Sequence, residues 1–249
     1  MTDARPLVSV VTVCFNAEQH LAEAMESVLV QTYPAIEYVV VDGGSTDGTL
    51  EIVRSFESRF GDKLCWVSES DEGIYDAMNK GIGMASGELI GLLNADDAYL
   101  PDAIERAIVA YADAPGASAV YGDVEIVDEL GASLRMEIAP EPAEIPLRPE
   151  RMPFCHQSLF VTRDAYEQLG GYDTSFRILA DYEWVLRAQA TGLPMAHVTA
   201  PLVRFRVGGT CSGDMARSNA ERERIRVWYG ANPLLERAKR VRHAVNRSG

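Results

Sequence analysis

The stretch Leu7-Val-Ser-Val-Val-Thr-Val-Cys-Phe15 decides the fold of this chain. It is β-branched and almost wholly apolar, which is typical of a parallel strand buried on both faces. Asn16 ends it, and residues 18–31 then place Leu21, Met25, Val28 and Leu29 on one face of a predicted helix. A buried strand followed by an amphipathic helix is the first part of a βαβ unit.

The same alternation continues to residue 93. The expected strands are 36–41, 64–67 and 88–93, and the expected helices between them are 49–59 and 74–85. This order predicts a doubly wound parallel sheet with right-handed crossovers. Ligands bind such sheets beyond the carboxyl ends of the strands. Asn16, Asp42 and the turn 94–97 follow strand ends, so we expect them at one edge.

The second half of the chain predicts a mixed sheet. The expected elements are a helix at 101–112, a hairpin of 119–127 and 133–138, a loop at 139–153, a strand at 156–161, helices at 162–169 and 180–191, and a strand at 196–205. We therefore expect an α/β domain over residues 1–210, with halves of about 1–98 and 99–210, and a basic helical tail over 211–249.

Composition excludes several classes of protein. The four cysteines are widely spaced and form no Cys-x-x-Cys pair, which argues against a zinc or redox motif. The longest apolar run is far below the roughly 20 residues of a membrane span. The N-terminus lacks the features of a signal peptide, so we expect a cytoplasmic protein. The net charge of −14 argues against nucleic-acid binding.

The charge is unevenly distributed. Residues 204–249 hold eleven Arg and Lys against four acids, a net +7, which leaves −21 for residues 1–203. Leu234, Ala238, Val241 and Val245 recur at helical spacing among basic residues, which predicts a basic amphipathic helix. Two interpretations stay open: peripheral contact with an anionic membrane at its inner face, or packing on the acidic body or on a homodimer partner.

Several acidic and polar residues near the predicted strand ends are candidates for chemistry. Asn94-Ala95-Asp96-Asp97 places two carboxylates where Mg²⁺ or Mn²⁺ can be held together with substrate phosphates, although by itself it also fits a helix-capping turn. Asp42 is placed to accept a hydrogen bond from a base, or to form a turn. Asp71 and Asp76 are candidates for sugar or ribose hydroxyls. Lys80 is a candidate for phosphate, or lies on a solvated helix face.

Four motifs in order carry a resemblance. They are Val10-Val-Thr-Val-Cys-Phe-Asn16, Val41-Asp-Gly-Gly-Ser-Thr-Asp-Gly-Thr49, Gly73-Ile-Tyr-Asp-Ala-Met-Asn-Lys-Gly81 and Leu93-Asn-Ala-Asp-Asp97. Together they resemble family 2 glycosyltransferases with the A-type fold, over about residues 7–210. The resemblance is strongest to the bacterial branch of exopolysaccharide, lipopolysaccharide and glycolipid synthesis. It implies a Rossmann-like, mostly parallel sheet flanked by helices, with a donor half and a mixed acceptor half.

The resemblance implies a nucleotide-sugar site. Thr12, Asn16 and Asp42 match positions that hold base and ribose, while Asp76 and Lys80 match the region beside the donor. The turn Asn94-Ala95-Asp96-Asp97 matches the family's Asp-x-Asp motif, whose residues bind the donor. Within it, Asp96 matches the metal-binding Asp. Asn94 departs from that motif, which leaves Asp96 and Asp97 as the charged candidates for the metal.

The acceptor half is expected to supply a base. Ala180-Asp181 is similar to the family's Glu-Asp motif with Ala in place of Glu, so Asp181 matches the base, with an N-cap as the alternative and Glu183 in reserve. His156 is a candidate for diphosphate or acceptor, or is structural. Arg206 begins a basic segment expected to close over the diphosphate.

These observations predict an inverting, metal-dependent transfer of one sugar from a nucleotide-sugar, a UDP-sugar above others, to a hydroxyl of a glycan or lipid-linked acceptor. No Gln-x-x-Arg-Trp motif is present, so processive synthesis is not expected. Two rivals stay open. Asn94 and Ala180 favour an inactive nucleotide-sugar-binding module, whereas a sugar nucleotidyltransferase would carry a Gly-rich phosphate loop that is absent after residue 16.

Overall fold

The computed structural model describes residues 5–145, 152–208 and 214–230. In chain order its strands and helices are β1 (Val8–Cys14), α1 (Leu21–Leu29), β2 (Ile36–Asp42), α2 (Thr49–Phe60), β3 (Leu64–Ser68), α3 (Ile74–Met84), β4 (Leu89–Asn94), β5 (Ala98–Tyr99), α4 (Ala103–Asp113), β6 (Ala119–Val127), β7 (Ser133–Glu137), β8 (Phe160–Thr162), α5 (Arg163–Leu169), α6 (Ala180–Thr191), β9 (Met195–Arg206) and α7 (Met215–Gly230). Three short 3-10 helices are η1 (Gly61–Lys63), η2 (Pro142–Glu144) and η3 (His156–Ser158).

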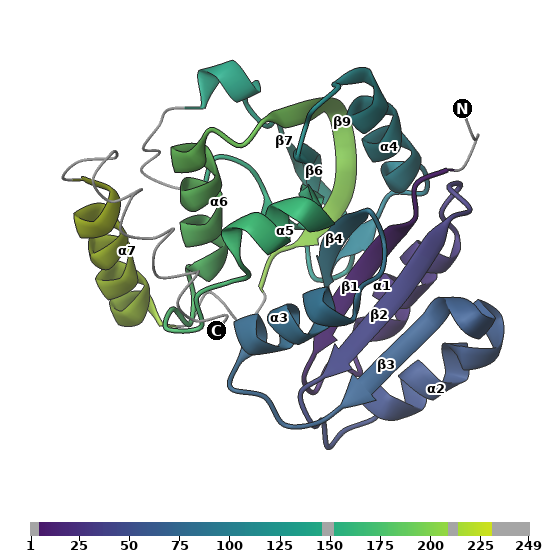
Figure 1. Cartoon of the computed structure of the whole chain (residues 1–249). Helices are drawn as coiled ribbons and strands as arrows, with labels where there is room; N and C mark the ends of the chain where they lie inside the picture. Colours follow the sequence, from purple (N-terminus) through teal and green to yellow (C-terminus); the bar gives the residue numbers. More distant parts are fainter. Residues whose placement is uncertain (1–4, 146–151, 209–213, 231–249) are drawn as a thin grey trace.

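All the described strands belong to one sheet, in the order β3-β2-β1-β4-β8-β6-β9-β5, with β7 paired to β6 (Figure 1). The first four strands are parallel, as predicted, because a helix between each strand and the next returns the chain to the same end. β8 runs antiparallel to β4, and the remainder is mixed. The α/β fold predicted from the sequence is therefore confirmed.

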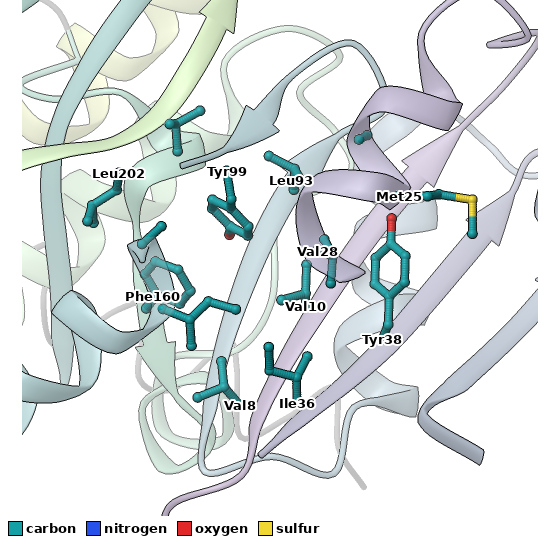
Figure 2. Packing of buried hydrophobic residues seen from close by; sticks show 14 of the residues in the cluster. Val8, Val10, Met25, Val28, Ile36, Tyr38, Leu93, Tyr99, Phe160 and Leu202 are labelled. Carbon is teal, nitrogen blue, oxygen red and sulfur yellow. The ribbon is translucent and has the colours of Figure 1, made fainter. Parts of the chain in front are cut away.

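Helices cover both faces of the sheet. One core cluster joins α1, α2 and α4 to the sheet, and the other joins α3, α5 and α6 to the opposite face. Alternation along β1 divides its side chains between them, since Val10 packs in the first cluster and Val11 in the second. Figure 2 shows the first cluster, where Val10 and Tyr38 lie on the face covered by Met25 of α1.

The strand register decides where polar side chains emerge. Cys14 lies opposite Asp42 in the β1–β2 pair, and Val13 lies opposite Asn94 in the β1–β4 pair. The three strands consequently end at one level. Asn16, Asp42 and the turn 94–97 follow these ends at a single edge of the sheet, as the alternation predicted.

Two local predictions were wrong. The strand expected at 156–161 is a 3-10 turn over His156–Ser158, and β8 begins only at Phe160. The Ser158 hydroxyl lies 2.8 Å from the carbonyl oxygens of both Gly122 and Cys155, which holds the turn against β6. The strand β5 was not predicted, because two residues carry no readable periodicity.

The first part of the tail packs against the body. In α7, Ile225 is buried in the second core cluster, and the Tyr229 hydroxyl donates to Oε1 of Glu183 in α6 at 2.6 Å. Figure 1 shows α7 beside α6. The amphipathic helix predicted over Leu234 to Val245 lies outside the described residues. Within residues 5–145, 152–208 and 214–230, no helix is long and apolar enough to cross a bilayer.

Candidate active site

Asp42 organises the turn that follows β2. Its fully buried Oδ2 accepts hydrogen bonds from the backbone N–H groups of Gly44 and Ser45, at 3.1 and 3.0 Å, and from the Ser68 hydroxyl at 2.6 Å. Its Oδ1 accepts from the Ser45 hydroxyl. The lone pairs of Asp42 are thus directed into its own loop, where they hold the residues of the turn in place.

Asn16 and Thr12 complete this corner of the site. Asn16 adopts a φ of 48°, a left-handed conformation that Asn tolerates, and its Oδ1 accepts from the N–H of Thr46 at 2.9 Å. Thr12 is fully buried, and its hydroxyl accepts from Tyr38 at 3.0 Å. Asn16 is exposed and lies at the surface of the site, whereas Thr12 lies beneath it.

Gly43 lets a second loop approach the first. A Cβ at this position would lie 2.5 Å from Oδ2 of Asp71, so a larger residue would displace the Asp71 side chain. Oδ1 of Asp71 accepts from the N–H of Gly73, just before α3. Lys80 pairs with Glu69 at 3.1 Å and with Asp76 at 3.5 Å. The two loops are therefore in contact, and the Lys80 ammonium is held by carboxylates.

The acidic turn after β4 separates its two carboxylates. Asp97 is buried, and its Oδ1 accepts from the backbone N–H of Arg206 at 2.9 Å, whereas Asp96 is half-buried. Burial raises the pKa of Asp97 well above its usual value, and the neighbouring Asp96 carboxylate adds to the rise. Oδ2 of Asp97 and Oδ1 of Asn94 are buried and have no hydrogen-bond partner among the described residues. The turn thus offers two buried acceptors without protein donors, beside the half-buried carboxylate of Asp96.

Arg206 holds this turn against the β6–β7 hairpin. Its Nε donates to the carbonyl oxygen of Asp96 at 3.1 Å, and its Nη1 donates to the carbonyl oxygens of Asp128 and Glu129 at 3.1 and 2.7 Å. Its Nη2 donates to Oε2 of Glu23 at 2.6 Å. The buried guanidinium is therefore engaged with the protein in this structure, rather than turned toward a ligand.

Asp181 lies in the first turn of α6, facing α3. Its Oδ1 is 3.0 Å from the Tyr75 hydroxyl, which also lies 2.6 Å from the carbonyl oxygen of Ile178. The N–H of Tyr182 donates to the same Oδ1 at 2.8 Å. A side chain from the donor half thus holds the candidate base of the acceptor half, across more than a hundred residues of sequence.

His156 and Tyr172 form a pair that is bound to α3. His156 is buried, and its Nε2 is 2.6 Å from the Tyr172 hydroxyl. Asn79 of α3 binds the backbone of Tyr172 twice, accepting from its N–H at 2.8 Å and donating to its carbonyl at 2.9 Å. Burial lowers the pKa of His156, and the Asp181 carboxylate opposes that shift. His156 is thus held by Tyr172, whose backbone is bound in turn by α3.

Cys155, the residue before His156, is influenced by the acidic turn. Burial raises the pKa of the Cys155 thiol, and the Asp97 carboxylate adds to that rise. The contacts that lead from the turn after β2 to Asp181 run through α3. Asp71, in the loop before this helix, packs on Gly43, and Tyr75 in its first turn holds Asp181.

Sequence reasoning missed three of the residues that build this site. Tyr75 lies inside the 73–81 motif and Tyr172 follows the predicted helix 162–169, and their aromatic rings alone did not distinguish a positioning role from core packing. Glu221 of α7 was counted only as a charge of the tail, although it is buried. Burial of a carboxylate is the signal that would have singled it out, and it is visible only in three dimensions. Among the described residues, no group of three or more His, Cys, Asp and Glu side chains gathers as a metal site.

Comparison with known proteins places this geometry in a family. Residues 9–170 match the sequence profile described as "Glycosyl transferase family 2". The chain is 32% identical over 185 residues to a "PGL/p-HBAD biosynthesis glycosyltransferase" of Mycobacterium bovis, covering 74% of this chain and 70% of the relative. It is 36% identical over 193 residues to an uncharacterised glycosyltransferase of Mycobacterium tuberculosis, covering 76% of this chain and 70% of that protein.

The fold is also shared with solved structures. The crystal structure of S. aureus TarS 1-349 in complex with UDP-GlcNAc is similar with a TM-score of 0.68 and 18% identity, over 83% of this chain and 61% of that one. Another TarS crystal structure gives a TM-score of 0.66 and 19% identity, over 81% of this chain and 37% of that chain. The chain therefore spans less than two thirds of these structures. The profile match over more than half of the chain, with relatives above 30% identity, shows that this protein is a glycosyltransferase of family 2.

Proposed function

We propose that the protein transfers one sugar, with inversion, from a UDP-sugar to a hydroxyl of a glycolipid or glycan acceptor. The observation that carries the proposal is the half-buried Asp181 carboxylate, held by Tyr75 in the first turn of α3, a helix whose preceding loop contacts the turn after β2. A base and a diphosphate-binding edge in one site are what sugar transfer to a hydroxyl requires.

The donor fits the edge formed by β1, β2 and β4. The Oδ1 of Asn94 and the Oδ2 of Asp97 are buried and lack donors among the described residues, and bound water can supply them. A UDP-sugar is favoured because the similar TarS structure was solved with UDP-GlcNAc. Asn16 is an exposed polar residue of this edge, and the Gly44 backbone allows close approach of a base.

A divalent cation fits this edge through Asp96. Mg²⁺ and Mn²⁺ are commonly held by one or two carboxylates together with water and substrate phosphates, so a single half-buried Asp is a sufficient protein ligand. Asp97 is directed inward and stands behind it. When bound, such an ion supplies positive charge to the departing diphosphate. Asn94, in place of an acid, keeps the net negative charge of the turn lower.

The chemical step uses the side chains of the acceptor half. Asp181 accepts the proton of the acceptor hydroxyl as its oxygen forms a bond to the donor C1 and the bond from C1 to the diphosphate oxygen breaks. The proton ends on Asp181, and the electron pair leaves with the nucleoside diphosphate. Attack from the side opposite the leaving group inverts C1. Tyr75 fixes the direction of the carboxylate, and positioning supplies much of the rate.

A glycolipid acceptor is favoured by the names of the relatives, one of which is assigned to PGL/p-HBAD biosynthesis. The basic tail supports the same proposal, because residues 211–249 hold nine Arg and Lys against four acids, a net +5. Contact of this tail with anionic lipid would bring the site close to a lipid-linked hydroxyl.

A donor screen with matched variants tests the proposal. We expect release of nucleoside diphosphate from one of a set of UDP-, GDP- and dTDP-sugars in the presence of Mn²⁺ and a glycolipid acceptor. Asp181→Asn should lower kcat by about 10²–10⁴-fold without weakening donor binding in calorimetry. Asp96→Asn should weaken Mn²⁺-dependent binding of UDP. Binding of a nucleotide-sugar without turnover of any donor would instead favour an inactive binding module.

A further inference from the structure

Glu221 of α7 has an unusual set of partners. Its carboxylate is buried and accepts hydrogen bonds from three consecutive backbone N–H groups, those of Arg177 at 2.7 Å, Ile178 at 3.0 Å and Leu179 at 2.9 Å. These are the residues immediately before α6. Charged acceptors make stronger hydrogen bonds than neutral ones, and a negative charge is favourable at a helix N-terminus.

The segment bound by Glu221 leads directly to Asp181. The N–H of Ile178 is held by Glu221 and its carbonyl oxygen by the Tyr75 hydroxyl at 2.6 Å, so the peptide groups on both sides of this residue are fixed. The same hydroxyl lies 3.0 Å from Oδ1 of Asp181. Glu221 and Tyr75 therefore fix the backbone from opposite sides, three residues before the candidate base.

Other contacts hold α7 in this position. The Arg224 guanidinium stacks on Phe176 at 3.8 Å from the ring centroid and on Trp228 at 4.4 Å. Arg224 also donates to the carbonyl oxygen of Ser175 at 3.2 Å, and Ile225 is buried. The helix α7 thus contacts residues 175–179 through side-chain packing as well as through the Glu221 carboxylate. Removing the carboxylate alone leaves these contacts to keep α7 docked.

We propose that Glu221 is a positioning residue that sets the place of the Asp181 carboxylate, and that α7 is consequently part of the catalytic apparatus rather than only a tail. This inference rests on the proposed role of Asp181 as base. It assigns to Glu221 an effect on the chemical step, exerted through the backbone of residues 177–181, with no contact to donor or acceptor.

The test compares Glu221→Ala and Glu221→Gln with Glu223→Gln, a matched change on the exposed side of the same helix. With the donor found in the screen, UDP-GlcNAc first, we expect kcat to fall about 10²-fold for Ala and about tenfold for Gln, because small misplacements of a base carry losses of this order. The KM for the donor should stay within about twofold of the parent, since the donor edge is built by other elements. Glu223→Gln should match the parent in both constants.

A double-mutant cycle separates positioning from general damage. If Glu221 acts through Asp181, Glu221→Gln should cause no further loss of kcat in an Asp181→Asn background. Hydrogen exchange of peptides spanning residues 173–182 gives a readout independent of any donor. Faster exchange there in Glu221→Ala than in Glu223→Gln is expected.

The inference and the proposed function fail in different ways. Near-parental turnover in Asp181→Asn would refute the role of Asp181 as base, and with it the effect of Glu221 on the chemical step. Hydrogen exchange would then show only whether Glu221 orders residues 173–182. Loss of turnover in Asp181→Asn, with parental kcat in Glu221→Ala, would overturn the role of Glu221 alone. Unchanged exchange in residues 173–182 of Glu221→Ala would overturn it whatever the donor, as would a multiplicative loss in the cycle.

Discussion

Replacing Asp42 with alanine tests whether this carboxylate holds the donor loop together. The side chain is fully buried and accepts from two backbone N–H groups, those of Gly44 and Ser45, and from two hydroxyls, those of Ser45 and Ser68. Alanine removes both carboxylate oxygens, so all four donors lose their acceptor at once. The hydroxyls can turn to other partners, but the two N–H groups are fixed by the backbone.

The magnitude follows from those two N–H groups. Leaving a buried donor unpaired costs about 1–3 kcal/mol, and both N–H groups here are only partly buried, so Asp42→Ala should lower the free energy of unfolding by about 2–4 kcal/mol. Asp42→Asn should cost only about 1–2 kcal/mol. Both N–H groups bind the same oxygen, Oδ2, and an amide oxygen in that place can still accept from both. The amide NH₂ then faces the Ser45 hydroxyl and Cys14 Sγ, which can both accept.

Urea unfolding followed by circular dichroism measures the difference, with exposed Asp62→Ala as the control for loss of a carboxylate. We expect the order Asp62→Ala, Asp42→Asn, Asp42→Ala in increasing destabilisation, and weaker UDP binding in calorimetry for the last variant. Equal unfolding free energies for Asp42→Ala and Asp42→Asn would show that the hydrogen bonds to Oδ2 do not hold the loop, and would refute the reasoning.

Three further perturbations follow from other contacts. Burial raises the pKa of Asp97 in the folded state, so protonation of this group stabilises the fold; the effect is complete below the unfolded pKa of about 3.9 and is lost as pH rises through the folded pKa. Asp97→Asn does not titrate, so its stability relative to the parent should rise between pH 4 and pH 8. An equal difference between the two urea curves at both pH values would contradict this. A Cβ on Gly81 would lie 2.2 Å from Cγ1 of Val11, so Gly81→Ala should destabilise by about 1–3 kcal/mol, whereas Gly83→Ala on the same helix meets nothing within 4 Å and should be neutral or stabilising in thermal unfolding. Arg206→Lys keeps the charge but loses the several N–H donors of the guanidinium, so it should lower the free energy of unfolding by about 2–3 kcal/mol and weaken Mn²⁺-dependent UDP binding. If neither quantity changes, Arg206 does not hold the acidic turn in place.

Much of the donor half could be predicted from the sequence. The bounds of β1, β2 and β4 were expected within one residue at each end, because buried parallel strands show as β-branched apolar runs interrupted by polar turns. Convergence of Asn16, Asp42 and the turn 94–97 then follows from parallel connectivity alone. The acceptor half was harder, since short elements such as β5 and η3 carry too few residues to show a period.

The roles of individual side chains were less predictable than their neighbourhood. Arg206 was expected to face a diphosphate, and in the structure its guanidinium binds the acidic turn and the hairpin beyond it. His156 was expected either beside diphosphate or acceptor or in a structural role, and it is paired with Tyr172. The partners of both side chains depend on which groups the fold brings within hydrogen-bonding distance.

By itself the sequence determined the α/β class, the parallel order of the first strands and the edge at which the polar turns gather. These three features depend on the periodicity of apolar residues and on short connections, both of which are local properties of the sequence. The tertiary structure alone decided that Asp97 is directed inward, that Tyr75 holds Asp181 and that Glu221 supports the segment before it. Those contacts join residues separated by 109, 106 and 42–44 positions, and no local pattern encodes a pairing over such distances.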